Sequence, residues 1–281
     1  MTTAALRVSK QDIDSYRRDG AVCLRGLISP AWLDALREGV EKNLRSPSPE
    51  AQVYSEPGEP GFFMHDYDLW KRIPSMRDFT FESPLAAVAG KMMGAGQVNL
   101  LNELVTMKEP GTANVTDWHQ DYPYFAVDGD QVCATWVPLI AISPDNALEF
   151  VKGSHRWGRA FAPIDSQLDG TPYRGEEFEL VPDIESRRGD YDILSWELEP
   201  GDCVVFHLLT LHKGKVDPKN TVPRRAVSHR WLGDDAVYAV RVPEAEFPKV
   251  KPKLEDGEPM RNAADFPLIW KAPDRNSPAQ N

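Results

Sequence analysis

Hydrophobic and polar positions alternate at helical spacing in the first part of the chain. From residue 30, apolar residues mark one face of a helix in "AWLDALREGVEKNL": Leu33, Leu36, Val40 and Leu44. Ser29 and Pro30 are typical of the start of this helix. An earlier helix, "DIDSYRRDG", follows the capping-box pair Ser9 and Asp12 and ends at Gly20. With the short strand "AVCLRGL" between them, the pattern predicts helix, strand, helix, and a further short helix over 83–94.

From about residue 97 the pattern changes to short apolar runs separated by turns. The runs are "VNLLNELVTM", "QVCATWVPLIAI", "ALEFV", "DCVVFHLLTLH" and "RRAVSHRWLG". The turn signals between them are Pro110-Gly111, Asp128-Gly129, Gly153-Ser154 and Pro200-Gly201. Regularly punctuated strands of this kind predict an all-β sandwich, barrel or jelly roll. Residues 46–62, rich in Pro, Ser, Gly and Glu, predict a long surface loop or lid.

The 281 residues are expected to form a single domain, 1–281. Its parts would be a β core at about 97–240, an N-terminal helical support at 9–95, and a proline-containing tail at 243–281 that wraps the core in extended form. The helices before residue 46 are too few to bury a core of their own. Hydrophobic residues make up 41% of the chain, enough for a sizeable core.

Charge and cysteine content narrow the class of protein further. The net charge of −11 argues against nucleic-acid and acidic-lipid partners, which require a basic surface. We expect no membrane span and no signal peptide, because no apolar run is long enough. The three cysteines, Cys23, Cys133 and Cys203, each lie inside an apolar run without CxxC spacing. They predict buried thiols in a reducing compartment, and hence a cytoplasmic protein.

The segment "DWHQDYPYF" carries the first candidate chemistry. In a strand, His119 and Asp121 point to the same side while Gln120 points away. Two histidines and one carboxylate on one face of a metal leave three coordination positions open, as in non-haem Fe(II) oxygenases. A His-x-Asp triplet alone is weak evidence, so a third ligand must come from elsewhere in the chain.

The other histidines differ in their suitability as that ligand. His212 ends the apolar run "DCVVFHLLTLH", where a strand would open into a loop. His207 lies five residues earlier and would face the opposite side of a regular strand. His155, in "KGSHRWG", is expected to brace a turn by hydrogen bonds. Arg224 and Arg225 begin the next strand; either could pair with a buried carboxylate, and surface charges are the simpler interpretation of both.

Taken together, these segments resemble the phytanoyl-CoA dioxygenase family of Fe(II)/2-oxoglutarate oxygenases. The matching segments, in order, are "YRRDGAVCLRGLISPAWLDALREGV", "WHQDYPYF", "ATWVPLIAIS", "NALEFVKGSHRWG", "EPGDCVVFHLLTLHKG" and "RRAVSHRW". The resemblance spans about residues 10 to 235. It implies a mainly β fold with flanking helices around a double-stranded β-helix (jelly roll, cupin-like) core. It also implies Fe(II) held by His119, Asp121 and His212, with 2-oxoglutarate and O2 as cosubstrates and Arg224 gripping the far carboxylate of 2-oxoglutarate.

The resemblance extends less firmly to other positions. Trp136 matches a position lining the cosubstrate pocket, and Asn102 and Leu104 share a strand face where relatives contact the cosubstrate. Ordinary core packing is the alternative for all three. The chain departs from the family at two places: it has Asn146-Ala147 where Asn-Gly is common, and Lys213-Gly214 after the distal histidine, where many members have a small or hydroxyl residue. The second departure could remove one hydrogen bond to the cosubstrate.

The resemblance implies an oxygenase that hydroxylates an aliphatic carbon and releases succinate and CO2. Asp121 makes halogenation unfavourable, because related halogenases carry a small residue there. Two alternatives remain: a jelly-roll metalloenzyme that does not use 2-oxoglutarate, such as a Zn hydrolase, and a non-catalytic member that binds a small molecule. The segments "FFMHDYDLWKR" and "YPYF" favour a small polar or amphipathic substrate. His65 and Tyr124 are the candidate substrate-side groups.

Overall fold

A computed structural model describes residues 8–56, 58–112, 114–163, 178–215, 219, 221–240, 253–261 and 264–273. The N-terminal part contains α1 (Lys10–Asp19), β1 (Ala21–Leu24), α2 (Pro30–Arg45), β2 (Gln52–Val53), β3 (Phe63–Tyr67), η1 (Leu69–Lys71), α3 (Pro74–Glu82) and α4 (Leu85–Met93). The β-rich part contains β4 (Gln97–Lys108), β5 (Thr116–His119), η2 (Tyr122–Tyr124), β6 (Val127–Asp128), β7 (Val132–Pro138), β8 (Leu148–Val151), η3 (Ser154–Arg156), η4 (Arg188–Asp190), β9 (Ile193–Ser195), β10 (Cys203–His207), β11 (His212–Gly214), β12 (Arg224–Leu232), β13 (Val237–Tyr238) and β14 (Leu268–Lys271).

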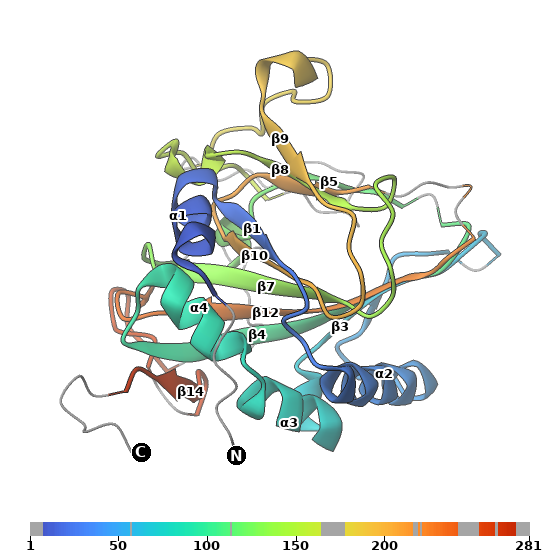
Figure 1. The fold of residues 1–281 in the computed structure, drawn as a ribbon, viewed down its shortest axis with the longest axis horizontal. Helices are drawn as coiled ribbons and strands as arrows, with labels where there is room; N and C mark the ends of the chain where they lie inside the picture. Colours follow the sequence, from blue (N-terminus) through green and yellow to red (C-terminus); the bar gives the residue numbers. More distant parts are fainter. Residues whose placement is uncertain are drawn as a thin grey trace.

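Two antiparallel sheets form the body of the molecule (Figure 1). The large sheet has eight strands in the order β1-β10-β7-β12-β4-β3-β2, with β14 also paired to β4. The small sheet has four strands in the order β5-β11-β8-β9. One apolar cluster joins the inner faces of both sheets, including Trp136, Phe150 and Phe206. This arrangement is the predicted double-stranded β-helix with flanking helices.

The helices cover the outer face of the large sheet. A second apolar cluster packs Leu36 of α2, Phe79 of α3 and Val88 of α4 against Val105 and Val227 of the sheet. Side chains of a strand alternate between its two faces, so the neighbours of Val105 and Val227 in sequence point inward, between the sheets. This alternation sets which residues of β4 and β12 can reach a site in the interior.

The predicted ends of the N-terminal helices are confirmed. Ser9 Oγ accepts a hydrogen bond from the backbone N–H of Asp12 at 3.1 Å, and the Asp12 carboxylate accepts one from the N–H of Ser9 at 2.8 Å. Gly20 ends α1 at φ +83°, a left-handed conformation that glycine adopts without steric cost. In α2, Ser29 caps the first turn and Leu33, Leu36 and Val40 are buried.

The sequence pattern suggested that the apolar run 202–212 is one strand, but the structure divides it into two. It forms β10 in the large sheet and β11 in the small sheet, joined by a turn in which Thr210 N–H donates to the His207 carbonyl at 2.8 Å. Leu208 and Leu211 are fully buried in and beside this turn, so hydrophobicity alone does not reveal it. Two further elements, β3 and α3, lie where the sequence analysis assigned none.

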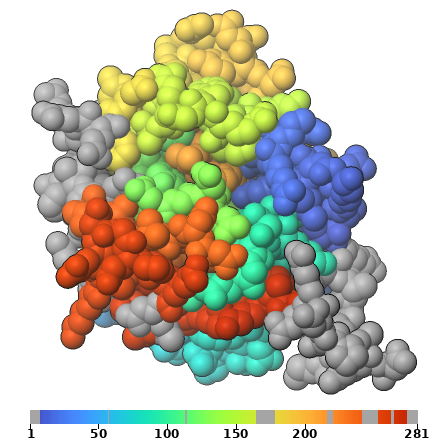
Figure 2. All heavy atoms as spheres, turned by 90° about the vertical axis from the view of Figure 1, so that its left-hand side faces the viewer, coloured from blue at the N-terminus to red at the C-terminus, as the bar shows by residue number. Residues whose placement is uncertain are grey.

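Parts of the predicted loop and tail have regular structure. Within residues 46–62, β2 pairs with β3. In the tail, β14 adds to the edge of β4, and the C-terminal residues, shown in red in Figure 2, spread over one side of the molecule. Of the tail's prolines, Pro243, Pro248 and Pro252 lie outside the described residues. The part of the chain that is described includes no helix long and apolar enough to cross a membrane. Cys133 and Cys203 are buried and Cys23 is partly buried, all three without disulfides.

Candidate metal centre

His119 and His212 lie next to each other on adjacent strands of the small sheet. His119 is the last residue of β5, His212 is the first of β11, and the two are register partners with ring centroids 4.2 Å apart. Each ring places Nδ1 near a backbone carbonyl two residues earlier: Asp117 O at 2.7 Å from His119 and Thr210 O at 2.9 Å from His212. When Nδ1 carries the proton, Nε2 keeps its lone pair, which is the state that binds a metal.

Asp121 completes the group from just beyond β5. It does not continue the strand, as the sequence analysis expected, but has a helical backbone (φ −70°, ψ −34°) at the start of η2. Its Oδ1 lies 3.5 Å from Nε2 of His119 and 3.7 Å from Nε2 of His212. The three ligand atoms all lie within 4.8 Å of one another. As predicted, Gln120 points away, with Oε1 accepting from the Phe161 N–H at 2.9 Å.

Arg230 holds the second oxygen of Asp121. Its Nε and Nη2 both lie 3.0 Å from Asp121 Oδ2, and the two side chains are buried. The carboxylate is therefore divided, with Oδ1 directed toward the imidazoles and Oδ2 bound to the guanidinium. The sequence analysis missed Arg230; the signal was its even spacing from Arg224 in β12, which places both arginines on one strand face.

Charge and burial set the protonation states of this group. Burial disfavours the ionised form of Asp121, but interactions led by the charge of the Arg230 guanidinium outweigh it and hold the pKa of Asp121 below its ordinary value. Burial, followed by the neighbouring His119, lowers the pKa of His212 to about 3. An ionised carboxylate beside a neutral imidazole matches the protonation states that metal binding requires.

The donor set fits Fe(II). Two imidazole nitrogens and one carboxylate oxygen within 4.8 Å of one another are the donor set of a facial triad. Because Oδ2 is already held by Arg230, Asp121 can offer a metal only one oxygen without breaking that pair. One oxygen from Asp121 leaves three coordination positions for other ligands.

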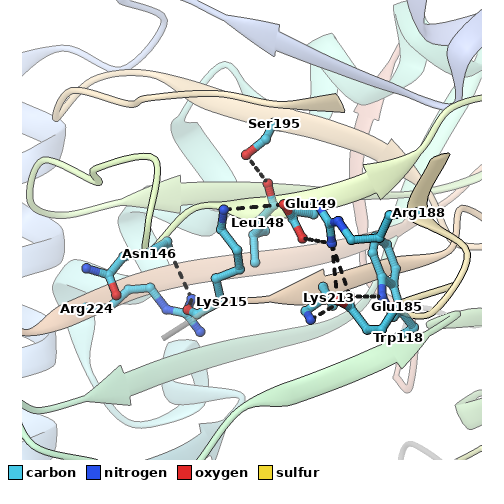
Figure 3. A network of polar contacts seen from close by, with 10 residues as sticks. All are labelled: Trp118, Asn146, Leu148, Glu149, Glu185, Arg188, Ser195, Lys213, Lys215 and Arg224. Carbon is cyan, nitrogen blue, oxygen red and sulfur yellow. Dashed lines mark hydrogen bonds and ion pairs between the residues drawn. The ribbon is translucent and has the colours of Figure 1, made fainter. Parts of the chain in front are cut away.

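Arg224, the first residue of β12, is a buried cation that lies next to Gly214, the last residue of β11. Its Nη1 donates to the carbonyls of Asn146 at 3.1 Å and Lys215 at 2.7 Å, contacts visible in Figure 3. Nε has no hydrogen-bond partner, and among the described residues no carboxylate pairs with Arg224. Burial lowers its pKa to about 10, so the side chain remains a cation at neutral pH. A buried guanidinium without an anion is a site for an anionic ligand.

Three other predicted residues lie on the same inner face of the large sheet. Trp136 on β7 and Leu104 on β4 both pair with Ser228 of β12, and Asn102 pairs with Arg230. All three are buried, and Asn102 Oδ1 has no hydrogen-bond partner within the described part of the chain. The strand register thus places Trp136 and Leu104 in a row between Arg224 and Arg230, and Asn102 in the row of Arg230 itself.

The candidate substrate-side residues, His65 and Tyr124, both lie close to this group. His65 on β3 pairs with Thr106 and so faces inward, with Nδ1 3.2 Å from the Tyr54 hydroxyl. Burial, followed by the charges of Lys108 and Arg230, holds the pKa of His65 below its usual range. The Tyr124 ring meets His119 edge to face, with centroids 6.0 Å apart.

The remaining candidates lie outside the group. His207 Nε2 contacts the Asp130 carbonyl at 2.9 Å, and its Nδ1 accepts from the Leu209 N–H at 3.1 Å, so both nitrogens are occupied. His155 Nε2 contacts the Arg17 carbonyl at 3.2 Å, which ties the turn to α1. Arg225 faces the helices, where it pairs with Glu41 and Glu109.

A network of ion pairs and hydrogen bonds links side chains of β5, β8 and β11 to the segment around Arg188 (Figure 3). Glu149 of β8 binds Arg188 at 2.8 Å and Lys215 at 3.3 Å. Glu185 binds Lys213 of β11 at 2.8 Å and accepts from Trp118 Nε1 of β5 at 2.6 Å. The network therefore ties the strands that carry His119 and His212 to the segment around Arg188.

Comparison with solved structures shows the same fold in several iron- and 2-oxoglutarate-dependent enzymes. The carbocyclase SnoK from nogalamycin biosynthesis has 19% identity and a TM-score of 0.73, covering 94% of this chain and 97% of its own. The epimerase SnoN, in complex with Fe3+, alpha ketoglutarate and nogalamycin RO, has 20% identity, a TM-score of 0.72, and coverages of 93% and 98%. EctD from S. alaskensis, with 2-oxoglutarate and 5-hydroxyectoine, has 18% identity, a TM-score of 0.69, and coverages of 92% and 88%.

The sequence itself matches the phytanoyl-CoA dioxygenase (PhyH) family over residues 16–225. The matched range contains the three clustered candidates His119, Asp121 and His212, together with Arg224. The cofactors expected from the sequence, iron and 2-oxoglutarate, agree with this family and with the donor set of the site. The chain belongs to the phytanoyl-CoA dioxygenase family of iron- and 2-oxoglutarate-dependent oxygenases.

Proposed function

We propose that this oxygenase hydroxylates an aliphatic carbon of a small polar or amphipathic metabolite, with release of succinate and CO2 from 2-oxoglutarate. His119, Asp121 and His212 would hold Fe(II), which when bound supplies the redox chemistry of O2 activation. The observation that carries the proposal is the set of two imidazole nitrogens and one carboxylate oxygen that lie within 4.8 Å of one another. Arg224, a buried cation that pairs with no carboxylate of the described residues, favours 2-oxoglutarate use over the alternative metalloenzymes.

In this proposal Arg224 binds the far carboxylate of 2-oxoglutarate. Nε has no partner, and a planar guanidinium can give a carboxylate two parallel hydrogen bonds. Trp136 and Leu104 flank Ser228 on the same face, where they would enclose the methylene groups of the cosubstrate and exclude water. Asn102, with Oδ1 unpartnered, would contact the ligands on the metal side.

The substrate would bind between His65 and Tyr124. Because burial and nearby cations keep His65 neutral, one ring nitrogen can donate and the other accept a hydrogen bond. Gln52 Oε1 accepts from the hydroxyls of Tyr54 at 2.8 Å and Tyr67 at 2.9 Å, which adds a polar, aromatic surface next to His65. Such a surface suits a metabolite that carries hydroxyl, carbonyl or amide groups on an aliphatic skeleton.

Anaerobic binding followed by turnover tests the proposal. Adding 2-oxoglutarate to the Fe(II)-loaded protein should produce the charge-transfer absorption expected by resemblance to the family. Succinate should then form from 2-oxoglutarate in the presence of O2 and ascorbate, and formation should rise with a substrate from a metabolite screen. A metal-loaded protein that neither binds nor consumes 2-oxoglutarate would contradict the proposal.

The fate of the substrate separates hydroxylation from the other outcomes known for this fold. Similar structures include a carbocyclase and an epimerase, whose products need not gain an oxygen atom. We expect the product to gain one oxygen atom from labelled O2. A product of unchanged composition would indicate epimerisation instead of hydroxylation. A product that has lost two hydrogens would indicate ring closure or desaturation.

A further inference from the structure

Lys108, the last residue of β4, is a second buried cation in the interior. It is 2% exposed. Its Nζ donates to the Asn114 carbonyl and to Thr116 Oγ1, both at 3.0 Å, and lies 4.0 Å from the centroid of the Phe63 ring. All of these partners are neutral, and within the described ranges Lys108 forms no ion pair. The exposed Asp117 acts on its charge only from a distance.

Lys108 and Arg224 lie side by side. They are register partners on β4 and β12, and both point between the sheets. Burial and the charge of Arg224 hold the pKa of Lys108 well below its ordinary value, so an anion bound beside the two side chains would favour the charged ammonium. Two neighbouring buried cations without an anion are unfavourable, so an anion between them would relieve both.

Both cations reach the small sheet at a single cross-strand pair. Lys108 contacts Thr116 of β5, and Gly214 of β11 faces Arg224 so closely that a Cβ there would lie 2.9 Å from Nη2. Thr116 and Gly214 are register partners, and the next pair in the ladder is His119 with His212. The two cations therefore converge on the row adjacent to the candidate metal ligands.

The distance between these rows suits the length of 2-oxoglutarate. Gly214 follows His212 by two residues, which is roughly 7 Å along an antiparallel strand. An extended five-carbon diacid has four carbon–carbon bonds of about 1.5 Å each, and it adds a metal bond at one end and hydrogen bonds at the other. Its far carboxylate would therefore reach the row of Lys108 and Arg224 when its 2-oxo acid end lies at the metal.

We propose that Lys108 is a second cationic anchor for 2-oxoglutarate. The Lys108 ammonium binds one oxygen of the far carboxylate, and Arg224 binds the other. The inference rests on the proposed function, because it requires that 2-oxoglutarate be the ligand. The guanidinium supplies a planar fork and the ammonium a compact point charge, so the two cations have different roles. Asn114, Thr116 and Phe63 position the ammonium.

The test compares two 2-oxo acids in wild type and Lys108→Met. Binding is followed by charge-transfer absorption of the anaerobic Fe(II) protein. For 2-oxoglutarate, Lys108→Met should raise Kd about 10- to 150-fold, the loss expected for one hydrogen bond to a charged group. For 2-oxopentanoate, which has the same chain length but no far carboxylate, Kd should not change. Iron content measured by metal analysis should also stay the same.

Lys71→Met is the matched control, since Lys71 also contacts an aromatic ring, Trp70, and pairs with Asp68 outside the interior. It should bind both acids as wild type does. If Lys108→Met does not fold, Thr116→Val removes one acceptor of the ammonium and should weaken binding of 2-oxoglutarate alone.

The possible results distinguish a failure of the proposed function from a failure of the proposed role of Lys108. Wild type that fails to bind 2-oxoglutarate overturns the proposed function, and the role of Lys108 with it. Wild type that binds, with equal affinity in Lys108→Met, overturns the role of Lys108 alone. Equal weakening of both acids in Lys108→Met shows a structural role and also overturns it.

Discussion

Replacing Arg230 by Met tests how the protein keeps Asp121 ionised and aimed. The substitution removes the partner of a buried carboxylate whose Oδ2 accepts two contacts at 3.0 Å. Breaking a buried ion pair by removing one member costs about 3–5 kcal/mol, because the remaining charge is left in a poorly solvated place. For a chain of this length, about 2–4 °C in Tm per kcal/mol corresponds to a fall on the order of 10 °C in the metal-free protein.

Metal should reverse most of that loss, because a divalent cation at the site supplies the missing positive charge next to Asp121. Urea unfolding with a chelator and with Zn(II) or Fe(II) measures both values. Arg187→Met is the control: Arg187 pairs with Asp190 on the exposed surface, and its loss should cause no measurable change. Asp121→Asn combined with Arg230→Met should be less destabilising than the sum of the single changes. A metal-free Arg230→Met protein as stable as wild type would refute the reasoning.

Four further predictions concern the ligands, the cosubstrate, pH and cooperativity. Alanine at His119, Asp121 or His212 should abolish turnover and weaken iron binding, whereas His207→Ala and His155→Ala should retain iron by metal analysis; the reverse pattern for 207 and 212 would show the ligand assignment to be wrong. Arg224→Ala should weaken 2-oxoglutarate binding by about 3–5 kcal/mol, roughly a hundredfold to several thousandfold. Arg224→Lys should recover part of the affinity, and Arg225→Ala should change it little. If neither alanine variant changes the affinity for 2-oxoglutarate, the result contradicts 2-oxoglutarate use. Burial holds the pKa of His207 at about 4 and of His229 at about 3, so below about pH 6.5 the unfolded state takes up protons that the folded state does not. The free energy of unfolding should therefore fall, as the pH falls, by up to about 1.4 kcal/mol per pH unit for each histidine. Chemical denaturation at several pH values measures this dependence, and the same dependence on pH in His229→Gln as in wild type would contradict the prediction. Calorimetry should show a single unfolding transition for the whole chain, because helices and sheet share one apolar cluster, and two separable transitions would argue for two domains.

The parts of the fold that depend on local pattern were predictable from the sequence. The capping pair Ser9 and Asp12 and the apolar face of α2 depend on residues three and four apart, and both are present in the structure. The assignment of strands to sheets was not predictable in the same way. Leu208 and Leu211, in and beside the turn, are fully buried, so hydrophobicity does not mark the point where the chain passes from one sheet to the other.

In the candidate site, too, local spacing was predictable from the sequence, whereas contacts between distant segments were not. His119 and Asp121 were paired by their spacing, yet the backbone turns at Asp121, and proximity to the imidazoles comes from that turn rather than from strand alternation. Arg230 could not be linked to Asp121 by spacing, since 109 residues separate them. It also lies beyond residue 225, where the family match ends. Lys108 required the register of β4 with β12, which sequence pattern does not determine.

The unequal distribution of charge affects how an anionic cosubstrate arrives. The chain as a whole carries a net charge of −11, whereas three basic side chains, Lys108, Arg224 and Arg230, lie buried between the sheets, and in the described part of the chain only Arg230 pairs with a carboxylate, that of Asp121. A dianion in solution is therefore repelled at long range and attracted only near the interior. Added salt screens exposed charges over about 8 Å at physiological ionic strength but acts weakly on buried ones. Moderate salt should thus speed the capture of 2-oxoglutarate, the opposite of the usual effect for an anion entering a cationic site.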